Sequence, residues 1–253
     1  MWPIILNLDA IVNSGLASLV KEPHQWLLYN KQFAHLLNNE MFDSDYWQNQ
    51  NAVTGSAQGR GTTYFVKCEA HDWVLRHYYR GGLIGKLIHD SYLYTGINNT
   101  RAVKEHILLS QLAQWQLPAP RPVACRIRRN GLSYRADIIS ERINNAEDLY
   151  TRLLREPLTD ELWQRIGKTI AAFHQKGVYH HDLNIHNILL DNKQQVWLID
   201  FDQGEIRSGG DWQQANVARL LRSFHKEKTK HPAIHWQDAH WQLLEQSYQQ
   251  TLK

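Results

Sequence analysis

The hydrophobic pattern of the chain changes near residue 140, and this change constrains the fold more than any other feature. Before it, short β-branched and aromatic runs such as TTYFVK at 62–67 alternate with turns. After it, apolar residues recur every three to four positions, which is the period of an amphipathic helix. We therefore expect an α+β, bilobal fold in a single domain of 253 residues. The expected parts are a β-rich N-terminal lobe over about 1–140, a hinge over about 141–145 and a mainly helical lobe over about 146–253.

Two hairpins are expected in the first half. The runs at 62–67 and 72–79 flank a short polar turn, so they predict adjacent antiparallel strands. Asn130 and Gly131 lie between two alternating runs, and Asn-Gly in such a place is the strongest short-range hairpin signal. The glycine-rich stretch GSAQGRG at 55–61 is expected to be a loop that leads into the first hairpin.

Helices are predicted from their caps and their apolar faces. Residues 100–114 form a candidate helix with Thr100 as N-cap. Residues 159–176 form another, with Thr159 as N-cap and Gly177 as its C-terminal stop. The expected apolar faces are Val103, Ile107, Leu108 and Leu112 in the first helix, and Leu162, Ile166, Ile170 and Phe173 in the second. Two more helices are expected around 212–226 and 236–252.

A pair of acids and an amide surround a predicted hairpin in residues 179–202. Asp182 and Asn187 are separated by four residues, as in the catalytic loop of protein kinases. Two apolar runs joined by the turn DNKQQ then bring the chain back to Asp200, beside Asn187. This arrangement predicts phosphoryl transfer, with Asp182 facing the acceptor hydroxyl and the other two holding one Mg²⁺. The alternative is a hairpin with solvated turn acids. Asp202 is either a second metal contact or a strand-end cap.

Residues upstream offer the groups that a nucleotide needs. Glycines in the 55–61 stretch allow backbone N–H groups to approach phosphate, although the stretch lacks the spacing G-x-G-x-x-G and a flexible turn is the alternative. Arg76 stands where kinases carry the lysine of V-A-I-K, and its expected partner is Glu105. Lys86 is a rival for the phosphate-binding cation, and solvated surface positions are the alternative for Arg76 and Glu105. The glycine candidates are Gly55, Gly59 and Gly61.

Several stretches together resemble the Kdo/heptose lipopolysaccharide kinase family, a branch of the protein-kinase-like fold. They are GRGTTYFV, VLRHYYRGGLIGKL, SERI, HHDLNIHNILLD, LIDFDQGEIR and NVARLLRSF, and the resemblance covers roughly residues 50–226. It implies an ATP-dependent phosphotransferase with ATP and Mg²⁺ as cofactors. It also implies an acceptor hydroxyl on 3-deoxy-D-manno-octulosonic acid (Kdo), carried by a lipid A precursor of a Gram-negative bacterium. Asp182 becomes the catalytic base or hydroxyl-orienting residue, Asn187 and Asp200 become metal ligands, and Arg76 takes the nucleotide phosphates. The implied nucleotide-binding set further contains Gly55, Gly59, Gly61, Glu105 and, in the hinge-like SERI, Glu141.

The chain also departs from the broader kinase pattern. No A-P-E follows Asp202, and the interval to Asp211 leaves little room for a segment that docks a peptide substrate. Asn184 replaces the lysine that is common in Ser/Thr kinase catalytic loops. The alternatives are another small-molecule kinase of the aminoglycoside or choline type, and a pseudokinase scaffold without catalysis.

Composition narrows the setting of the protein. A net charge of +3 does not indicate a nucleic-acid binder. Two cysteines, Cys68 and Cys125, cannot form a dense disulfide framework and lack metal-type spacing, so the simplest interpretation is a reducing cytoplasm. No transmembrane helix or signal peptide is indicated, and the pattern indicates no oligomeric state. The resemblance implies a peripheral protein at the cytoplasmic face of the inner membrane. Arginines suit an anionic acceptor, and Arg80 and Arg207 flank the predicted site, although a solvated surface position is the favoured alternative for each. His180 is expected to brace the catalytic loop by hydrogen bonding rather than to bind zinc.

Overall fold

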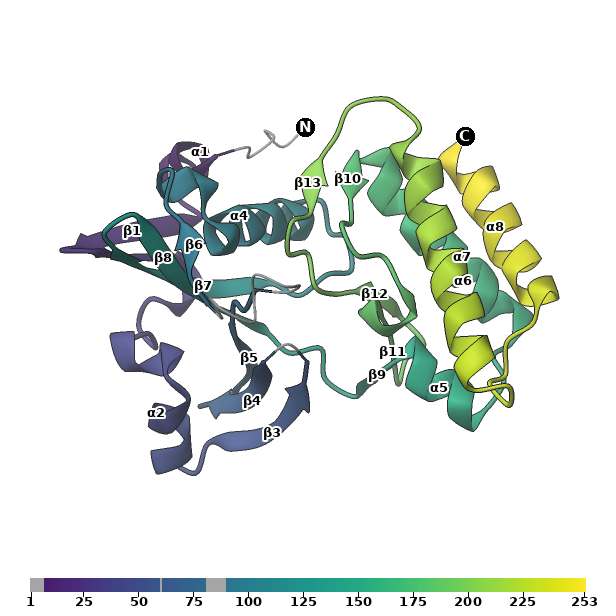
Figure 1. Ribbon diagram of the computed structural model, residues 1–253, viewed down its shortest axis with the longest axis horizontal. Helices are drawn as coiled ribbons and strands as arrows, with labels where there is room; N and C mark the ends of the chain where they lie inside the picture. The colour runs from purple at the N-terminus through teal and green to yellow at the C-terminus, as the bar shows by residue number, and fades with distance from the viewer. Residues whose placement is uncertain (1–6, 60, 81–89) are drawn as a thin grey trace. The chain divides into compact units, whose positions relative to one another are not determined.

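The computed structural model describes residues 7–59, 61–80 and 90–253, so the candidate Lys86 lies outside the described residues. The chain contains two compact units (Figure 1). The first unit comprises Met1–Gln111 and Pro120–Arg142, and the second comprises Leu112–Ala119 and Ile143–Lys253. The fold mixes helices with a large antiparallel sheet.

The first unit is built on an eight-stranded antiparallel sheet in the order β1-β2-β7-β8-β5-β4-β3, with β6 paired to β8. The strands are β1 (Ala17–Glu22), β2 (Gln25–Asn30), β3 (Val53–Gln58), β4 (Thr62–Cys68), β5 (His71–His77), β6 (Tyr92–Leu93), β7 (Pro122–Asn130) and β8 (Ser133–Glu141). Both predicted hairpins, β4–β5 and β7–β8, are confirmed. In the second one Asn130 pairs with Ser133, so the two loop residues are Gly131 and Leu132. Gly131 has a φ of 58°, a conformation that glycine adopts at low cost.

The glycine-rich stretch differs from its prediction as a loop. Gly55 lies inside β3 and pairs with Phe65 of β4, so only the end of the stretch remains in the β3–β4 turn. The physical reason is cross-strand pairing, because Ser56 and Ala57 meet Tyr64 and Thr63 in a continuous ladder.

Helices of the first unit cover the two faces of the sheet. They are α1 (Leu8–Asn13), α2 (Ser44–Asn49), α4 (Arg101–Gln114) and the short 3₁₀ turns η1 (Lys31–Phe33), η2 (Asn39–Phe42) and η3 (Ile97–Asn99); from Leu112 onward α4 counts with the second unit. The predicted apolar face of α4 is buried, which confirms the helix at 100–114. The Thr100 hydroxyl donates to the Ile97 carbonyl oxygen, which fixes the entry to α4. A cluster of aromatic side chains around Trp47 and Trp73 forms the core between α2 and the sheet.

The second unit consists mainly of helices. These are α5 (Leu149–Arg155), α6 (Asp160–Gln175), α7 (Trp212–Lys230) and α8 (Asp238–Leu252), and Figure 1 shows the last three lying together. Thr159 occupies the N-cap position of α6, without a side-chain capping hydrogen bond, and Gly177 follows the helix end with a φ of 74°, so this helix is confirmed. At Gly167 an added Cβ would lie 2.1 Å from the Leu244 carbonyl oxygen, so α6 and α8 approach closely because this residue lacks a side chain.

Short strands complete the second unit and carry the predicted site. The strands β9 (Ala146–Asp148), β11 (Ile188–Asp191) and β12 (Val196–Leu198) form one sheet, and β10 (Val178–Tyr179) pairs with β13 (Glu205–Ile206); the 3₁₀ turn η4 covers Ile185–Asn187. The hairpin predicted after Asn187 is β11–β12. Within the described part of the chain, no helix is long and apolar enough to cross a membrane.

Candidate active site

In the first unit, the buried carboxylate of Glu105 forms an ion pair with Arg76, the residue predicted to bind the nucleotide phosphates. Arg76 lies on β5, and its Nη2 donates to Glu105 Oε1 at 2.6 Å and to Oε2 at 2.5 Å. The Tyr78 hydroxyl donates to the same Oε2 at 2.5 Å. Glu105 is only 4% exposed, whereas about a quarter of the Arg76 side chain, 23%, is accessible. The predicted Arg76–Glu105 pair is therefore present, while its role in binding nucleotide stays a prediction.

The glycines of the β3–β4 turn differ in what surrounds them. A Cβ at Gly61 would lie 2.0 Å from the Tyr79 ring, whereas a Cβ at Gly59 would meet only a backbone oxygen at 3.7 Å. Gly59 closes the turn by donating its N–H to the Gly61 carbonyl oxygen at 3.0 Å. Close packing therefore requires glycine at position 61, whereas a Cβ at position 59 would make only an ordinary van der Waals contact.

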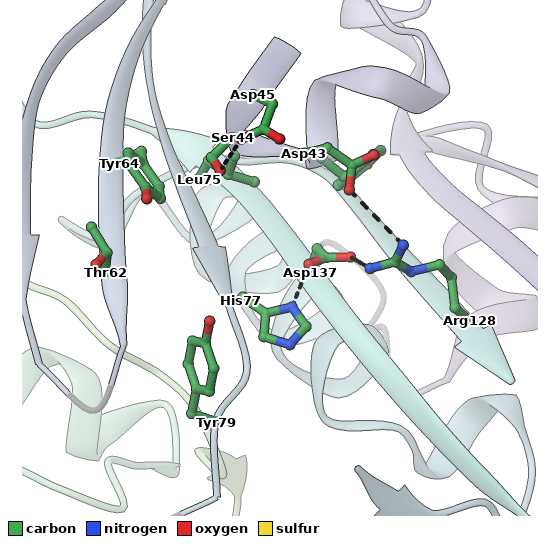
Figure 2. A pocket seen from close by; sticks show the side chains of 11 residues that line it. Asp43, Ser44, Asp45, Thr62, Tyr64, Leu75, His77, Tyr79, Arg128 and Asp137 are labelled. Carbon is green, nitrogen blue, oxygen red and sulfur yellow. Dashed lines mark hydrogen bonds and ion pairs between the residues drawn. The ribbon is translucent and has the colours of Figure 1, made fainter. Parts of the chain in front are cut away.

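A cavity of about 310 Å³ lies on the face of β5 opposite to Arg76 (Figure 2). Leu75, His77 and Tyr79 line it, and because side chains alternate along a strand, Arg76 and Tyr78 point to the opposite face. The cavity is therefore separate from the Arg76–Glu105 pair, and we do not assign the nucleotide to it.

The charged groups of this cavity are bonded to one another. The buried Asp137 accepts from Arg126 Nε at 3.0 Å and contacts His77 Nδ1 at 2.6 Å. Arg126 also donates to both carboxylate oxygens of Asp43, at 2.9 and 2.7 Å, and this hydrogen bonding lowers the pKa of Asp43. Arg128 lies 3.9 Å from Asp43 and 3.8 Å from Asp137 (Figure 2). This network fastens η2 and α2 to the sheet.

In the second unit the hairpin brings the predicted metal ligands together. Ile188 pairs with Leu198, and the Ile199 N–H donates to the Asn187 carbonyl oxygen at 3.0 Å. The next residue, Asp200, therefore follows directly beside Asn187. Asp200 has a φ of 62°, which is uncommon for a residue with a side chain and often marks a functional position.

The amide of Asn187 is oriented by the predicted catalytic loop, residues 180–187, called the catalytic loop below. Its Nδ2 donates to the Asp182 carbonyl oxygen at 2.9 Å, and Asn184 Nδ2 donates to the same oxygen at 3.0 Å. This leaves Asn187 Oδ1 without a partner among the described residues. An amide oxygen and the carboxylate of Asp200 are hard oxygen donors, so this pair fits a divalent cation such as Mg²⁺.

A neutral histidine joins the two ends of the site. His180 Nε2 lies 2.8 Å from the Ile199 carbonyl oxygen, and its Nδ1 accepts from the Asp182 N–H at 3.2 Å. Because Nδ1 accepts, Nε2 must carry the proton that it donates. Burial lowers the pKa of His180, which favours this neutral form. The predicted bracing role is confirmed.

One face of α7 contacts the catalytic loop along its length, and sequence reasoning did not assign a role to this face. Its contacting residues are Asn216, Arg219, Ser223 and Glu227, and their partners in the same order are His180, Asp182, Ile185 and His186. The intervals of three and four residues are those of a single helix face. The stretch NVARLLRSF contains Asn216, Arg219 and Ser223 at this spacing. The spacing alone does not indicate which segment of the chain this face contacts.

The polar contacts of this face differ in strength. Asn216 Nδ2 donates to the His180 carbonyl oxygen at 2.7 Å, and Ser223 Oγ accepts from the Ile185 N–H at 3.1 Å. Glu227 lies 3.6 Å from His186, and the carboxylate of Asp148, whose Oδ1 lies 3.7 Å from His186 Nδ1, raises the pKa of this histidine. The loop is thus held at several points by one rigid helix.

The candidate residues fall into two sets, each within one unit. The first unit holds Gly55, Gly59, Gly61, Arg76, Glu105 and Glu141. Glu141 ends β8, where its N–H donates to the Arg121 carbonyl oxygen at 2.8 Å. The second unit holds Asp182, Asn187 and Asp200, which its own backbone brings together.

Comparisons with known proteins identify the family of this chain. The model of the lipopolysaccharide kinase (Kdo/WaaP) family matches residues 44–248. A 3-deoxy-D-manno-octulosonic acid kinase of Vibrio parahaemolyticus is 46% identical over 224 residues, covering 88% of this chain and 94% of that protein. Proteins of the same name in Photobacterium profundum and Haemophilus influenzae are 50% identical over 208 residues and 41% identical over 240 residues. The Photobacterium match covers 82% of this chain and 88% of that relative. The Haemophilus match covers 91% of this chain and 98% of that relative. The chain belongs to the lipopolysaccharide kinase (Kdo/WaaP) family.

Proposed function

We propose that this protein transfers the γ-phosphate of ATP to a hydroxyl of Kdo on a lipid A precursor, a step of lipopolysaccharide core biosynthesis. The observation that carries the proposal is the backbone arrangement after Asp182. Asn187 Nδ2 donates to the Asp182 carbonyl oxygen, and the β11–β12 hairpin returns the chain so that Asp200 follows Ile199, whose N–H donates to the Asn187 carbonyl oxygen. The relatives named 3-deoxy-D-manno-octulosonic acid kinase, which are 41–50% identical to this chain, support the acceptor. The same similarity favours Kdo over the acceptors of aminoglycoside or choline kinases.

Each residue has a defined part in this reaction. Asp182 accepts the hydrogen of the acceptor hydroxyl and orients its oxygen toward the phosphorus atom. Asn187 and Asp200 hold Mg²⁺, which supplies positive charge to the phosphate oxygens when it is bound. Arg76, fixed by Glu105, offers a cation to the nucleotide phosphates. The remaining nucleotide contacts are proposed at the β3–β4 turn and at Glu141.

We also infer that the two units correspond to the two lobes of a protein-kinase-like domain over residues 1–253. The division after Arg142 falls in the predicted hinge at about 141–145, which supports this inference. Because the proposed acceptor is attached to a lipid, we propose that the protein works peripherally at the cytoplasmic face of the inner membrane.

Transfer to a defined acceptor tests the proposal. Purified protein is incubated with labelled ATP, MgCl₂ and a Kdo-bearing lipid A precursor, and the product is identified by mass spectrometry. Asp182→Asn should lower the transfer rate by about 10²–10⁴-fold, which is the usual contribution of a positioned acid or base. Asp160→Asn is the matched control, because Asp160 is exposed in the first turn of α6.

The roles of the metal ligands have a separate test. Asp200→Asn should raise the MgCl₂ concentration needed for half-maximal transfer, because the site loses a charged oxygen ligand. Wild-type protein that phosphorylates a different small molecule but not the Kdo lipid would refute the substrate. Wild-type protein that binds ATP but phosphorylates none of the acceptors tested would instead favour a pseudokinase.

A further inference from the structure

We propose that Arg219 is a further catalytic residue, whose guanidinium holds Asp182 with one edge and binds an anionic oxygen of the bound substrates with the other. This inference rests on the proposed function. Arg219 Nε donates to Asp182 Oδ1 at 3.1 Å, and Arg219 Nη2 donates to the same oxygen. A single carboxylate oxygen therefore takes both hydrogen bonds.

The contact leaves binding capacity on both side chains. A guanidinium has five N–H donors, and two of them go to Asp182. Arg219 has no other partner within the described residues, and 46% of its side chain is exposed. Oδ2 of Asp182 accepts no hydrogen bond from the described residues, and this side chain is 43% exposed. A hydroxyl bound to Oδ2 would thus lie close to the open edge of Arg219.

The reaction requires negative charge near this point. An acceptor oxygen that approaches Asp182 must also meet the phosphoryl group, whose equatorial oxygens carry the charge of the transition state. The proposed sugar acceptor adds a carboxylate of its own. Both are anionic oxygens, and arginine binds such oxygens bidentately.

The catalytic loop has no lysine or arginine with which to meet this charge. Residues 180–187 contain neither lysine nor arginine. Asn184 is neutral, and both ends of its amide are engaged, since Nδ2 donates to the Asp182 carbonyl oxygen and Oδ1 accepts from the His186 N–H at 2.8 Å. Arg219 on α7, which is distant from the loop in sequence, places a positive charge beside Asp182.

The mounting of Arg219 suits a catalytic role better than a stabilising one. On either side of it along α7, Asn216 and Ser223 bond the loop backbone, so the helix fixes the guanidinium relative to Asp182. Leu220, the next residue, is fully buried and anchors the helix. In contrast, an ion pair between half-exposed side chains contributes little to stability.

The test compares Arg219→Ala, Arg219→Lys and Arg222→Ala. Arg222 lies on α7 and is exposed, with no bond to the catalytic loop among the contacts of the described residues, so it is the matched control. Arg219→Ala should lower kcat by at least about 10²-fold, since arginines at phosphoryl groups contribute about 10³–10⁵-fold. Its Tm should stay within about 4 °C of wild type. Arg219→Lys should recover only part of the rate, because it keeps the charge but loses the planar fork.

Binding measurements identify which anionic oxygen is involved. If it belongs to the phosphoryl group, Arg219→Ala should weaken binding of a non-hydrolysable ATP analogue and leave ADP binding unchanged. If it belongs to the acceptor, the variant should weaken binding of free Kdo, and the methyl ester of Kdo should bind both proteins equally.

These outcomes separate the two proposals. An Arg219 variant with wild-type kcat and wild-type affinity for every probe would overturn the role of Arg219. If Arg219→Ala weakens binding of the ATP analogue while the wild-type protein phosphorylates a different sugar, the proposed acceptor is refuted. The proposed role of Arg219 then stands. A variant that loses activity together with its fold, seen as a large fall in Tm, would make Arg219 structural and would also overturn the proposal.

Discussion

The Glu105→Gln substitution is expected to destabilise the first unit by removing the charge that faces Arg76. Glu105 is 4% exposed and accepts hydrogen bonds of 2.5–2.6 Å from Arg76 and Tyr78. Glutamine keeps the shape of the side chain, but it turns one acceptor oxygen into a donor NH₂ that faces other donors. The substitution therefore changes charge and hydrogen bonding while leaving the packing of α4 nearly intact.

The magnitude follows from burial. Removing one partner of a buried ion pair typically costs about 3–5 kcal/mol. The Arg76 side chain is 23% exposed, so water screens part of its charge and we expect about 2–3 kcal/mol. A change of 1 kcal/mol shifts Tm by about 2–4 °C in a chain of this size, so Tm should fall by about 4–12 °C.

Thermal unfolding followed by tryptophan fluorescence measures this effect. Glu245→Gln is the matched control, because Glu245 is exposed on α8 and should unfold like wild type. The double variant Arg76→Met, Glu105→Leu should recover most of the loss, since apolar residues often replace a buried pair at little cost. A Glu105→Gln protein that unfolds within 1–2 °C of wild type, roughly the shift of a surface substitution, would refute the reasoning.

Three further predictions concern stability. Gly167→Ala should cost about 1–3 kcal/mol, because its Cβ would lie 2.1 Å from the Leu244 carbonyl oxygen; a Tm equal to wild type would contradict the close helix approach. Asp137→Asn should cost about 3 kcal/mol in urea unfolding, because the buried Arg126 loses a charged partner at 3.0 Å; an unchanged midpoint would show that Asp43 alone suffices. Burial lowers the pKa of His174 to about 4, below its unfolded value of 6.5, so the unfolded state binds more protons between these values. Stability should therefore be full above pH 6.5 and fall as pH drops toward 4, and equal Tm values at pH 5 and pH 7 would contradict this.

Elements that depend on local signals were predictable from the sequence. Thr159 and Gly177 mark the ends of α6, and Asn130-Gly131 marks a hairpin, because caps and turns involve residues that are neighbours in the chain. Sheet order was not predictable in this way. β2 pairs with β7, about a hundred residues later in the chain, so their adjacency depends on tertiary packing. The two-residue strands β10 and β13 carry no periodic pattern and form only because their partners lie opposite.

The glycine-rich stretch shows how tertiary context overrides a local interpretation. Composition predicts a loop over residues 55–61, but β4 offers Phe65, Tyr64 and Thr63 as pairing partners to its first half. Glycine weakens a strand by less than these pairings stabilise it. The sequence therefore identified the turn but placed its beginning too early.

The same distinction separates the two parts of the candidate active site. Asp182, Asn187 and Asp200 lie within nineteen residues, and a hairpin of ordinary length brings them together, so spacing was enough to group them. Arg219 reaches Asp182 from a separate helix, and its position depends on how α7 packs in the core. Phe224 is buried against Trp163 of α6, and this contact sets the rotation of α7. A helical spacing of polar residues is equally typical of a solvated face, so only the folded chain shows that this face holds the catalytic loop. We therefore expect substitutions that rotate α7, such as Phe224→Ala, to impair catalysis through Arg219.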